Sequence, residues 1–489
     1  MRTYATLLLS AFLGALGTAS SLHAAAYTFD NTNTAGLQDG GGNWNTSTAN
    51  WWNGSGNVAW PNLDTDEAIF GVSSTGTNNT INVSSVTTNK ITFAALSAGN
   101  YQLFGGAIAL GGTSPSIVAN NTVANGQVIR SALTGTSGFS KTGAGTLTFG
   151  ATGATSVNLS GLSGTIDLSG GNVFLAETGG GSAAAAWNIS TSGTNLGLSV
   201  TGTISLGSLS GVTNSVLRTG GTNSPIASIG ALNTDTTFSG NITGTIAITK
   251  VGTGTLTLAA LSAKNTYTGA TKIDAGTLAL AAGSSINKTP AIAVASGAIY
   301  DVSAVTGYTL GSTAAQTLKG AGTVNGSTTI AATNGTLIAG DVGTVGTLTF
   351  NNDLILAGTT SLDIVGVTDG THDKISVGGT LTAGGLLQLV IDSNFASTLS
   401  TAGGSATLTL FTVSSATNFS SIVMTGLDSG TFATTTAGSS LVGATSGITY
   451  TWNGDGTLLV AAIPEPSAYA AVFGALALAG AVWRSRRRA

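Results

Sequence analysis

The fold is decided by one stretch of nine residues, Lys250-Val251-Gly252-Thr253-Gly254-Thr255-Leu256-Thr257-Leu258. Successive side chains of a β-strand point to opposite faces, so Leu256 and Leu258 share one face and the two threonines share the other. We expect Gly254 to form the corner before this strand, because glycine tolerates the φ values that sharp turns require. Such a short strand cannot bury its leucines alone, so it must stack on similar strands.

Similar strands are spread along most of the chain. The triplet Gly-Thr-Leu or Gly-Thr-Ile recurs, and several of its intervals are near 10 or 20 residues; it stands at 145–147, 164–166, 202–204, 244–246, 254–256, 276–278, 335–337, 346–348, 379–381 and 456–458. A unit of about 20 residues is the size of one turn of a solenoid. Stacking the turns about 4.8 Å apart pairs their backbones and aligns the leucines in one core. The pattern therefore predicts an all-β fold, a parallel β-helix.

A family resemblance agrees with this prediction. The opening stretch is followed by Asn265-Thr266-Tyr267-Thr268-Gly269 and Ile273-Asp274-Ala275-Gly276-Thr277-Leu278. Together they resemble the autotransporter-associated β-strand repeat, and a degenerate copy begins at Lys141-Thr142-Gly143-Ala144-Gly145. The resemblance implies a right-handed β-helix of the passenger type over about 130–380.

Composition excludes several classes of protein. Apolar residues make up 42% of the 489 residues and charged residues only 7%, while Gly contributes 72. Ordered apolar patterning argues against disorder. The formal net charge of −4 and the lack of a basic cluster in the β-rich part argue against nucleic acid as a partner. There is no Cys and there are only 2 His, so we predict no disulfides, no metal site and no cofactor.

The N-terminus has the order of features that signal peptidase recognises. Arg2 is followed by an apolar run, Leu7–Leu16, and then by small residues ending in Ala24-Ala25-Ala26. We expect cleavage after Ala26, with Ala24 and Ala26 as the recognised small residues. The predicted organisation is a signal peptide (1–26), a Trp-rich N-terminal cap with the first β-helix turns (27–129), the repeat β-helix (130–380), a C-terminal β cap (381–462) and a C-terminal sorting segment (463–489). The sequence leaves open whether 381–462 continues the solenoid.

The C-terminal segment changes character abruptly. Ile463-Pro464-Glu465-Pro466-Ser467 interrupts strand structure, because proline lacks a backbone donor. Residues 468–483 carry no charge, and we predict that they form a single membrane helix of about 24 Å. The cationic residues after it would hold the C-terminus in the cytoplasm; they are Arg484, Arg486, Arg487 and Arg488.

These three parts, in this order, resemble the PEP-CTERM sorting signal. The resemblance implies export through the Sec machinery, a transient stay in the inner membrane, and processing at the Pro-Glu-Pro region by an exosortase. It further implies delivery to the surface or extracellular matrix of a Gram-negative-type bacterium, where extracellular polysaccharide is an expected partner.

Four tryptophans in the segment 27–100 allow two interpretations. Trp44, Trp51, Trp52 and Trp60 fall close together in a chain with seven Trp. They could fill the open end of the solenoid core, or they could form a platform on which sugars stack. The first interpretation is favoured because no group of polar residues accompanies the rings.

The sequence shows no catalytic site. The cluster Asp369-Gly370-Thr371-His372-Asp373-Lys374 contains the last His, but Asp-Gly before Ile375-Ser376-Val377 is typical of a turn that enters a strand. β-Helix polysaccharide lyases and hydrolases need paired carboxylates or a basic residue in a groove, and the acidic residues here are scattered. The leading hypothesis is a non-enzymatic surface or matrix protein. The alternatives are a glycan-binding adhesin that uses the tryptophans and a β-helix lyase or hydrolase.

Overall fold

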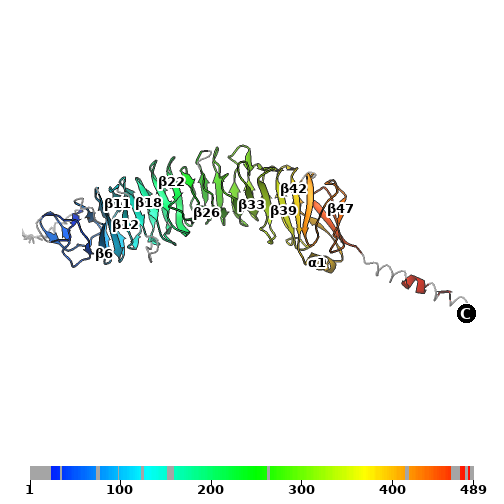
Figure 1. The fold of residues 1–489 in the computed structure, drawn as a ribbon, viewed down its shortest axis with the longest axis horizontal. Coiled ribbons are helices and arrows are strands. Elements are labelled where there is room, and N and C mark those ends of the chain that lie inside the picture. Colours follow the sequence, from blue (N-terminus) through cyan, green and yellow to red (C-terminus); the bar gives the residue numbers. More distant parts are fainter. Residues whose placement is uncertain are drawn as a thin grey trace, which may run out of the picture.

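The computed structural model describes residues 24–32, 36–72, 78–96, 98–122, 126–150, 159–261, 265–413, 418–463, 474–479 and 483–484. The protein is a long, gently curved rod in which successive coils stack in sequence order from the N-terminal end to the C-terminal end (Figure 1). It is an all-β solenoid of the right-handed type, as predicted. Within the described residues of the solenoid and its C-terminal cap there is one helix, α1 (Phe395–Thr401).

One ladder of paired parallel strands runs almost the full length of the rod and belongs to a 28-stranded sheet, but it changes face within two long strands, at 181–189 and 202–211. This main ladder consists of β1 (Ala26–Phe29), β5 (Glu67–Phe70), β8 (Lys90–Phe93), β11 (Ser116–Ala119), β14 (Gly138–Thr142), β17 (Gly164–Leu168), β19 (Gly181–Ile189), β21 (Gly202–Gly211), β23 (Pro225–Ile229), β26 (Ala247–Lys250), β28 (Thr271–Ile273), β30 (Ala291–Val294), β33 (Gln316–Gly320), β36 (Gly335–Ala339), β39 (Thr359–Ile364), β42 (Leu386–Ile391) and β45 (Ser421–Gly426). Short antiparallel strands extend it at the two ends, namely β3 (Trp51–Trp52), β4 (Asn57–Val58) and β46 (Gly430–Thr431).

The other faces of the coils change partway along the rod. In the N-terminal half they are a nine-stranded and a four-stranded parallel sheet. The first contains β2 (Gly42–Trp44), β6 (Asn78–Val83), β9 (Asn100–Gly105), β12 (Gln127–Ile129), β15 (Thr146–Phe149), β18 (Asn172–Leu175), β20 (Asn195–Leu198), β22 (Val216–Thr219) and β25 (Asn241–Thr243). The second contains β7 (Val86–Thr88), β10 (Ile108–Leu110), β13 (Leu133–Gly135) and β16 (Gly161–Leu162).

In the C-terminal half, a second ladder of the 28-stranded sheet continues the face of β17, because Leu168, Ile189, Gly211 and Phe238 pair in turn, and another four-stranded sheet forms a further face. The second ladder contains β24 (Thr236–Phe238), β27 (Thr255–Leu258), β29 (Thr277–Leu280), β31 (Ile299–Asp301), β34 (Thr323–Asn325), β37 (Thr347–Phe350), β40 (Lys374–Val377) and β44 (Phe411–Thr412). The four-stranded sheet contains β32 (Tyr308–Leu310), β35 (Thr328–Ile330), β38 (Leu354–Leu356) and β41 (Leu381–Ala383).

The core is a set of apolar columns, one residue from each coil. In β27, Leu256 and Leu258 are buried while Thr255 and Thr257 are half-buried on the outer face, which is the predicted alternation. Leu256 pairs with Leu278 of the next coil, and Leu278 pairs with Tyr300. The parallel register thus keeps every apolar set on the inside, since a slip of one residue would turn it outward.

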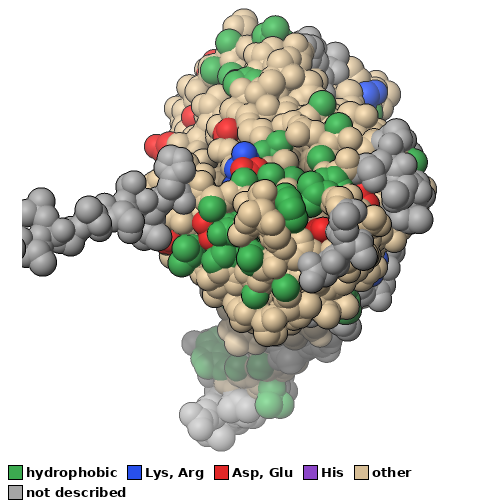
Figure 2. Space-filling view, turned by 90° about the vertical axis from the view of Figure 1, so that its left-hand side faces the viewer, with side chains coloured by type: hydrophobic (Ala, Val, Ile, Leu, Met, Phe, Trp, Pro, Cys, Tyr) green, Lys and Arg blue, Asp and Glu red, His purple; other side chains and the backbone are tan. Residues whose placement is uncertain are grey.

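The outer surface is correspondingly poor in charge. Viewed from its N-terminal end, the rod shows mostly uncharged polar side chains and backbone, with few basic or acidic groups (Figure 2). β-Branched Thr suits this position, because its side chain packs well on a pleated surface while its hydroxyl faces water.

The corner before β27 differs in detail from the prediction. The residue with positive φ is Gly252 (φ 70°), and Gly254 is not in the left-handed region. Gly254 is required for a different reason, because a Cβ there would lie 2.4 Å from the carbonyl oxygen of Thr234 on the preceding coil. The turn therefore uses one glycine for its backbone conformation and another for close contact between coils.

The segment 381–462 both continues and covers the solenoid. Strands β42, β44 and β45 extend the two ladders. The rest forms an antiparallel sheet of β43 (Ser405–Thr409), β47 (Ser439–Val442), β48 (Ile448–Trp452) and β49 (Thr457–Ala462). Its Trp452 and Tyr450 are buried, and Trp452 packs against Phe411 of the last coils. Such a cover protects a solenoid end from pairing with another chain.

Candidate functional site

The predicted processing sites lie mostly outside the described residues. Of the sorting motif only Ile463 is described, and it is half exposed; Pro464, Glu465, Pro466 and Ser467 are not described. Of the terminal arginines only Arg484 is described, while Arg486, Arg487 and Arg488 lie outside. In the described part of the chain, no helix has the length and apolar character needed to cross a bilayer, and most of the predicted membrane segment 468–483 lies outside that part.

The N-terminal boundary is partly described. Of the predicted signal peptide, only its last three residues belong to the described part. Ala24 precedes the first strand and Ala26 begins it, pairing with Glu67 in the parallel register of β1 and β5. Cleavage after Ala26 would therefore leave most of β1 attached to the mature chain.

The tryptophan cluster is part of the core. Trp44, Trp51 and Trp60 are buried, with ring centroids 4.7–5.3 Å apart. Phe29 and Phe70 pack against the same group. Buried faces cannot stack on a sugar, so the arrangement favours the interpretation in which the rings fill the end of the core. Trp52 alone is half-buried, and the structure thus forms no platform of four exposed rings.

The cluster around His372 is a turn, in agreement with the sequence interpretation. Gly370 has a φ of 84°, and β40 begins at Lys374. His372 is buried, and this burial lowers the pKa of its ring. Asp369 is well exposed whereas His372 is buried, so these two side chains do not share a cleft for acid–base chemistry. Among the described residues, no group of three potential ligands is placed to hold a metal ion.

Asp373 closes the base of this loop. Its carboxylate accepts hydrogen bonds from the backbone N–H of Gly346 at 2.7 Å and of Asp363 at 2.8 Å. Burial raises the pKa of Asp373 to about 7. The side chain is fully buried, so its role is structural. It connects the loop that follows β39 to the loop that follows β36, and both loops form the rim of a surface groove.

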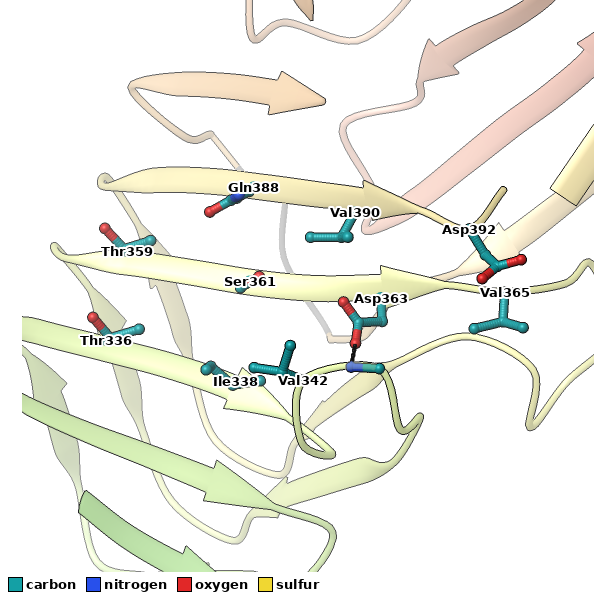
Figure 3. Close-up of a pocket in the computed structure, with 11 residues that line it drawn as sticks. Thr336, Ile338, Val342, Thr359, Ser361, Asp363, Val365, Gln388, Val390 and Asp392 are labelled. Carbon is teal, nitrogen blue, oxygen red and sulfur yellow. Dashed lines mark hydrogen bonds between the residues drawn. The ribbon is translucent and has the colours of Figure 1, made fainter. Parts of the chain in front are cut away.

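This groove lies on the outer face of the main ladder, over β36, β39 and β42 (Figure 3). It has a volume of about 450 Å³, within the range of small-ligand sites. The outward side chains of the three strands form its floor. One end is lined by hydroxyl and amide groups, from Thr336, Thr359, Ser361 and Gln388.

Aliphatic side chains line the rest of the groove. Ile338 and Val390 lie on the floor. Val342 and Val365 come from the loops that follow β36 and β39; Val342 is 80% exposed and Val365 is 36% exposed. No aromatic residue lines the groove.

Two carboxylates lie at the end of the groove where β39 and β42 finish (Figure 3). Asp363 is only 7% exposed, and one of its oxygens accepts a hydrogen bond from the N–H of Gly343 at 2.6 Å. Burial raises the pKa of Asp363. Asp392 is half-buried and accepts a hydrogen bond from the N–H of Asn394 at 2.8 Å. Within the described part of the chain, neither carboxylate forms an ion pair.

Sequence reasoning did not identify this groove. In the sequence the acidic residues are scattered, and Asp392 is far from Asp363. The register explains their proximity: Asp363 pairs with Val390 on the next coil, two residues before Asp392. The available signal was the two aliphatic residues, Ile338 and Val390, at outward positions of their strands.

The fold defines a class, the parallel β-helix, and comparisons with known proteins find a passenger-type repeat within it. Residues 248–280, which include β26 to β29, match the family model of the passenger-associated-transport-repeat. The chain is also similar to the Adhesin BmaC autotransporter of Brucella suis biovar 1 (strain 1330), with 32% identity over 180 residues. That alignment covers 35% of this chain and 5% of the adhesin, so the chain spans a small fraction of that relative. Both findings support the autotransporter-associated repeats expected from the sequence.

Proposed function

We propose that this protein is an exported, surface-exposed β-helix whose role is structural and non-enzymatic. The observation that carries the proposal is the stack of parallel coils from β1 to β45, which contains a passenger-type repeat. Such a rod gives reach and a large surface from a simple repeated unit. The similarity to an autotransporter adhesin supports a place outside the cell.

Sorting by the C-terminal signal is part of the same proposal. An N-terminal signal peptide would direct the chain into the Sec pathway, and an exosortase would process the Pro-Glu-Pro region while the tail stays transiently in the inner membrane. The mature rod would then join the cell surface or the extracellular matrix, with extracellular polysaccharide as its neighbour. The motif Ile463–Ser467, the uncharged segment after it and the final arginines support this route.

A double substitution tests the sorting route. Pro464→Ala with Pro466→Ala is expected to block processing and to hold the chain in the inner-membrane fraction. The matched control is Pro61→Ala with Pro290→Ala, because both of these prolines are exposed in loops of the rod. Mass spectrometry of the C-terminal peptide and antibody access on intact cells are the measurements. An unchanged C-terminus and an unchanged location in the first variant would refute the sorting proposal.

Adhesion is a second candidate function, favoured by the similarity to an adhesin. The tryptophan cluster is a weak basis for it, since three of the four rings are buried. Binding to the producer's polysaccharide would have to use Trp52 or another surface. Comparing polysaccharide binding by the unmodified protein and by Trp52→Ala distinguishes these possibilities, because a surface elsewhere would be unaffected by the substitution.

A further inference from the structure

The groove over β36, β39 and β42 is built differently from the rest of the outer surface. Single outward aliphatic residues occur elsewhere on the main ladder, such as Ile226, whereas here Ile338, Val342, Val365 and Val390 line one concave site. Nothing in the fold requires this lining, because Val342 is 80% exposed and lies in a loop. Exposed apolar groups gathered in a concave site are typical of a surface that contacts a partner.

The shape of the groove suits an extended chain. The floor of β39 runs from Thr359 to Asp363, five residues that span about 13 Å of strand. An extended peptide of about four residues would match that length and place its side chains between the aliphatic groups. A sugar would find no ring to stack on, since no lining residue is aromatic.

The two carboxylates at one end of the groove favour a ligand with a positive charge. Asp363 is largely desolvated and Asp392 half-buried, and neither has a cationic partner among the described residues. The N–H of Gly343 occupies one oxygen of Asp363, and Figure 3 shows both carboxylates at the same end of the groove. A cation entering here would gain two acceptors in a partly dry environment, where charge-assisted hydrogen bonds are strong.

We propose that this groove binds an extended peptide with aliphatic side chains and a Lys or Arg side chain that reaches Asp363 and Asp392. The aliphatic part of the peptide would cover Val342, Val365 and Val390. The inference goes beyond the proposed structural role and does not depend on the sorting route, because it concerns the folded rod alone.

Fluorescence anisotropy with the purified full chain tests this proposal. The probe is a fluorophore-labelled, C-terminally amidated peptide, Val-Ile-Val-Lys, and the comparison peptides are Val-Ile-Val-Glu and Ser-Thr-Ser-Lys. We expect binding of the first peptide, weakening as salt is added, and much weaker binding of the other two. Asp363→Asn with Asp392→Asn should weaken binding of the Lys peptide roughly tenfold or more. The Asn side chain keeps an acceptor for the N–H of Gly343, so the loop retains its hydrogen bond.

A second pair of variants separates the groove from general surface effects. Val342→Ser should weaken binding of the Lys peptide, whereas Val442→Ser should leave it unchanged, because Val442 is 54% exposed on β47 and does not line the groove. Circular dichroism of each variant checks that the β fold is intact.

Three outcomes would overturn the proposal. The first is equal binding of the Lys and Glu peptides. The second is unchanged affinity in the double Asn variant. The third is no peptide binding up to millimolar concentration; if polysaccharide fragments then bound and were lost on the same substitutions, the occupant would be a glycan. None of these outcomes bears on surface location, so the structural proposal is judged separately.

Discussion

Two lysines occupy core positions of the β-helix, and replacing one of them should destabilise its coil. Lys141 pairs with Ile117 on one side and Leu168 on the other, in a column that is otherwise apolar. It is fully buried, and its Nζ donates hydrogen bonds to the carbonyl oxygens of Gly143, Gly145 and Gly170 at 2.8, 2.7 and 2.6 Å. The ammonium group thus joins the corner of its own coil to the next coil.

The expected cost of Lys141→Met follows from these contacts. Hydrogen bonds to a charged group make a net contribution of about 1.5–3 kcal/mol each, so three of them represent about 5–9 kcal/mol. Burial lowers the pKa of Lys141 from 10.5 to about 8, which corresponds to roughly 3 kcal/mol of opposing cost. Methionine keeps the apolar stem but none of the bonds. Even after that cost is subtracted in full, we expect a loss of about 2–6 kcal/mol in the free energy of unfolding.

Urea denaturation followed by circular dichroism gives the overall stability, and hydrogen exchange of peptides from 138–150 and 164–175 locates the effect. Both peptides should lose protection in Lys141→Met, while coils near the C-terminus should change little, because repeats interact mainly with their neighbours. Lys272→Met is the matched control, since Lys272 is exposed on β28, and it should change stability by less than about 0.5 kcal/mol. Wild-type protection of both peptides in Lys141→Met would refute this reasoning.

Three further predictions concern the corner, the groove loop and the core of the N-terminal end. Gly252→Ala should destabilise the protein by about 2 kcal/mol or more, because Gly252 has a φ of 70° and a Cβ would lie 2.1 Å from the oxygen of Gly230. The control is Gly297→Ala, which has a similar φ but open space around the new Cβ, and urea denaturation should show a cost of only about 1 kcal/mol. Asp373 binds a proton in the folded state up to about pH 7 but loses it near pH 4 when unfolded, so its contribution to stability falls as the pH rises across this window. Asp373→Asn should therefore flatten the pH dependence of the urea midpoint between these two values. An unchanged slope would contradict the assignment. Trp51→Ala should cost about 3–5 kcal/mol through the cavity it leaves, and Trp52→Ala much less; equal losses measured by thermal unfolding would argue against the core role of Trp51.

The regular part of this fold could be predicted from sequence because each coil repeats the same physical problem. The alternation in Thr255–Leu258 determines which side chains face inward, and the recurrence of the triplet determines that the coils stack. The role of Gly252 could not be separated from that of Gly254 by spacing alone, since both precede the strand. Their difference depends on where the previous coil passes, and only the structure shows the oxygen atoms of Gly230 and Thr234.

The buried lysines were within reach of sequence reasoning but were not found. Lys141 and Lys250 stand at the same place in the two repeat copies, two residues before a glycine with positive φ. A charged residue in a core position is costly unless its hydrogen bonds are satisfied, so its repetition before a Gly-x-Gly corner is a sign of a turn that supplies acceptors. Lys250 donates in the same way to Val251, Gly252 and Ala275.

The groove was out of reach because it arises from departures from the repeat. The separation between register partners on the main ladder grows toward the C-terminus, from 23 residues (Thr336 to Thr359) to 27 (Thr359 to Leu386) and 35 (Leu386 to Ser421). The extra residues form loops beside an unchanged floor, and one such loop carries Val365. A rigid floor with variable loops at its edge is the usual way in which a repeated scaffold acquires a binding site. The coils from β36 to β42 are therefore where a specific partner should be sought, and the regular coils around β27 are where substitutions should affect stability alone.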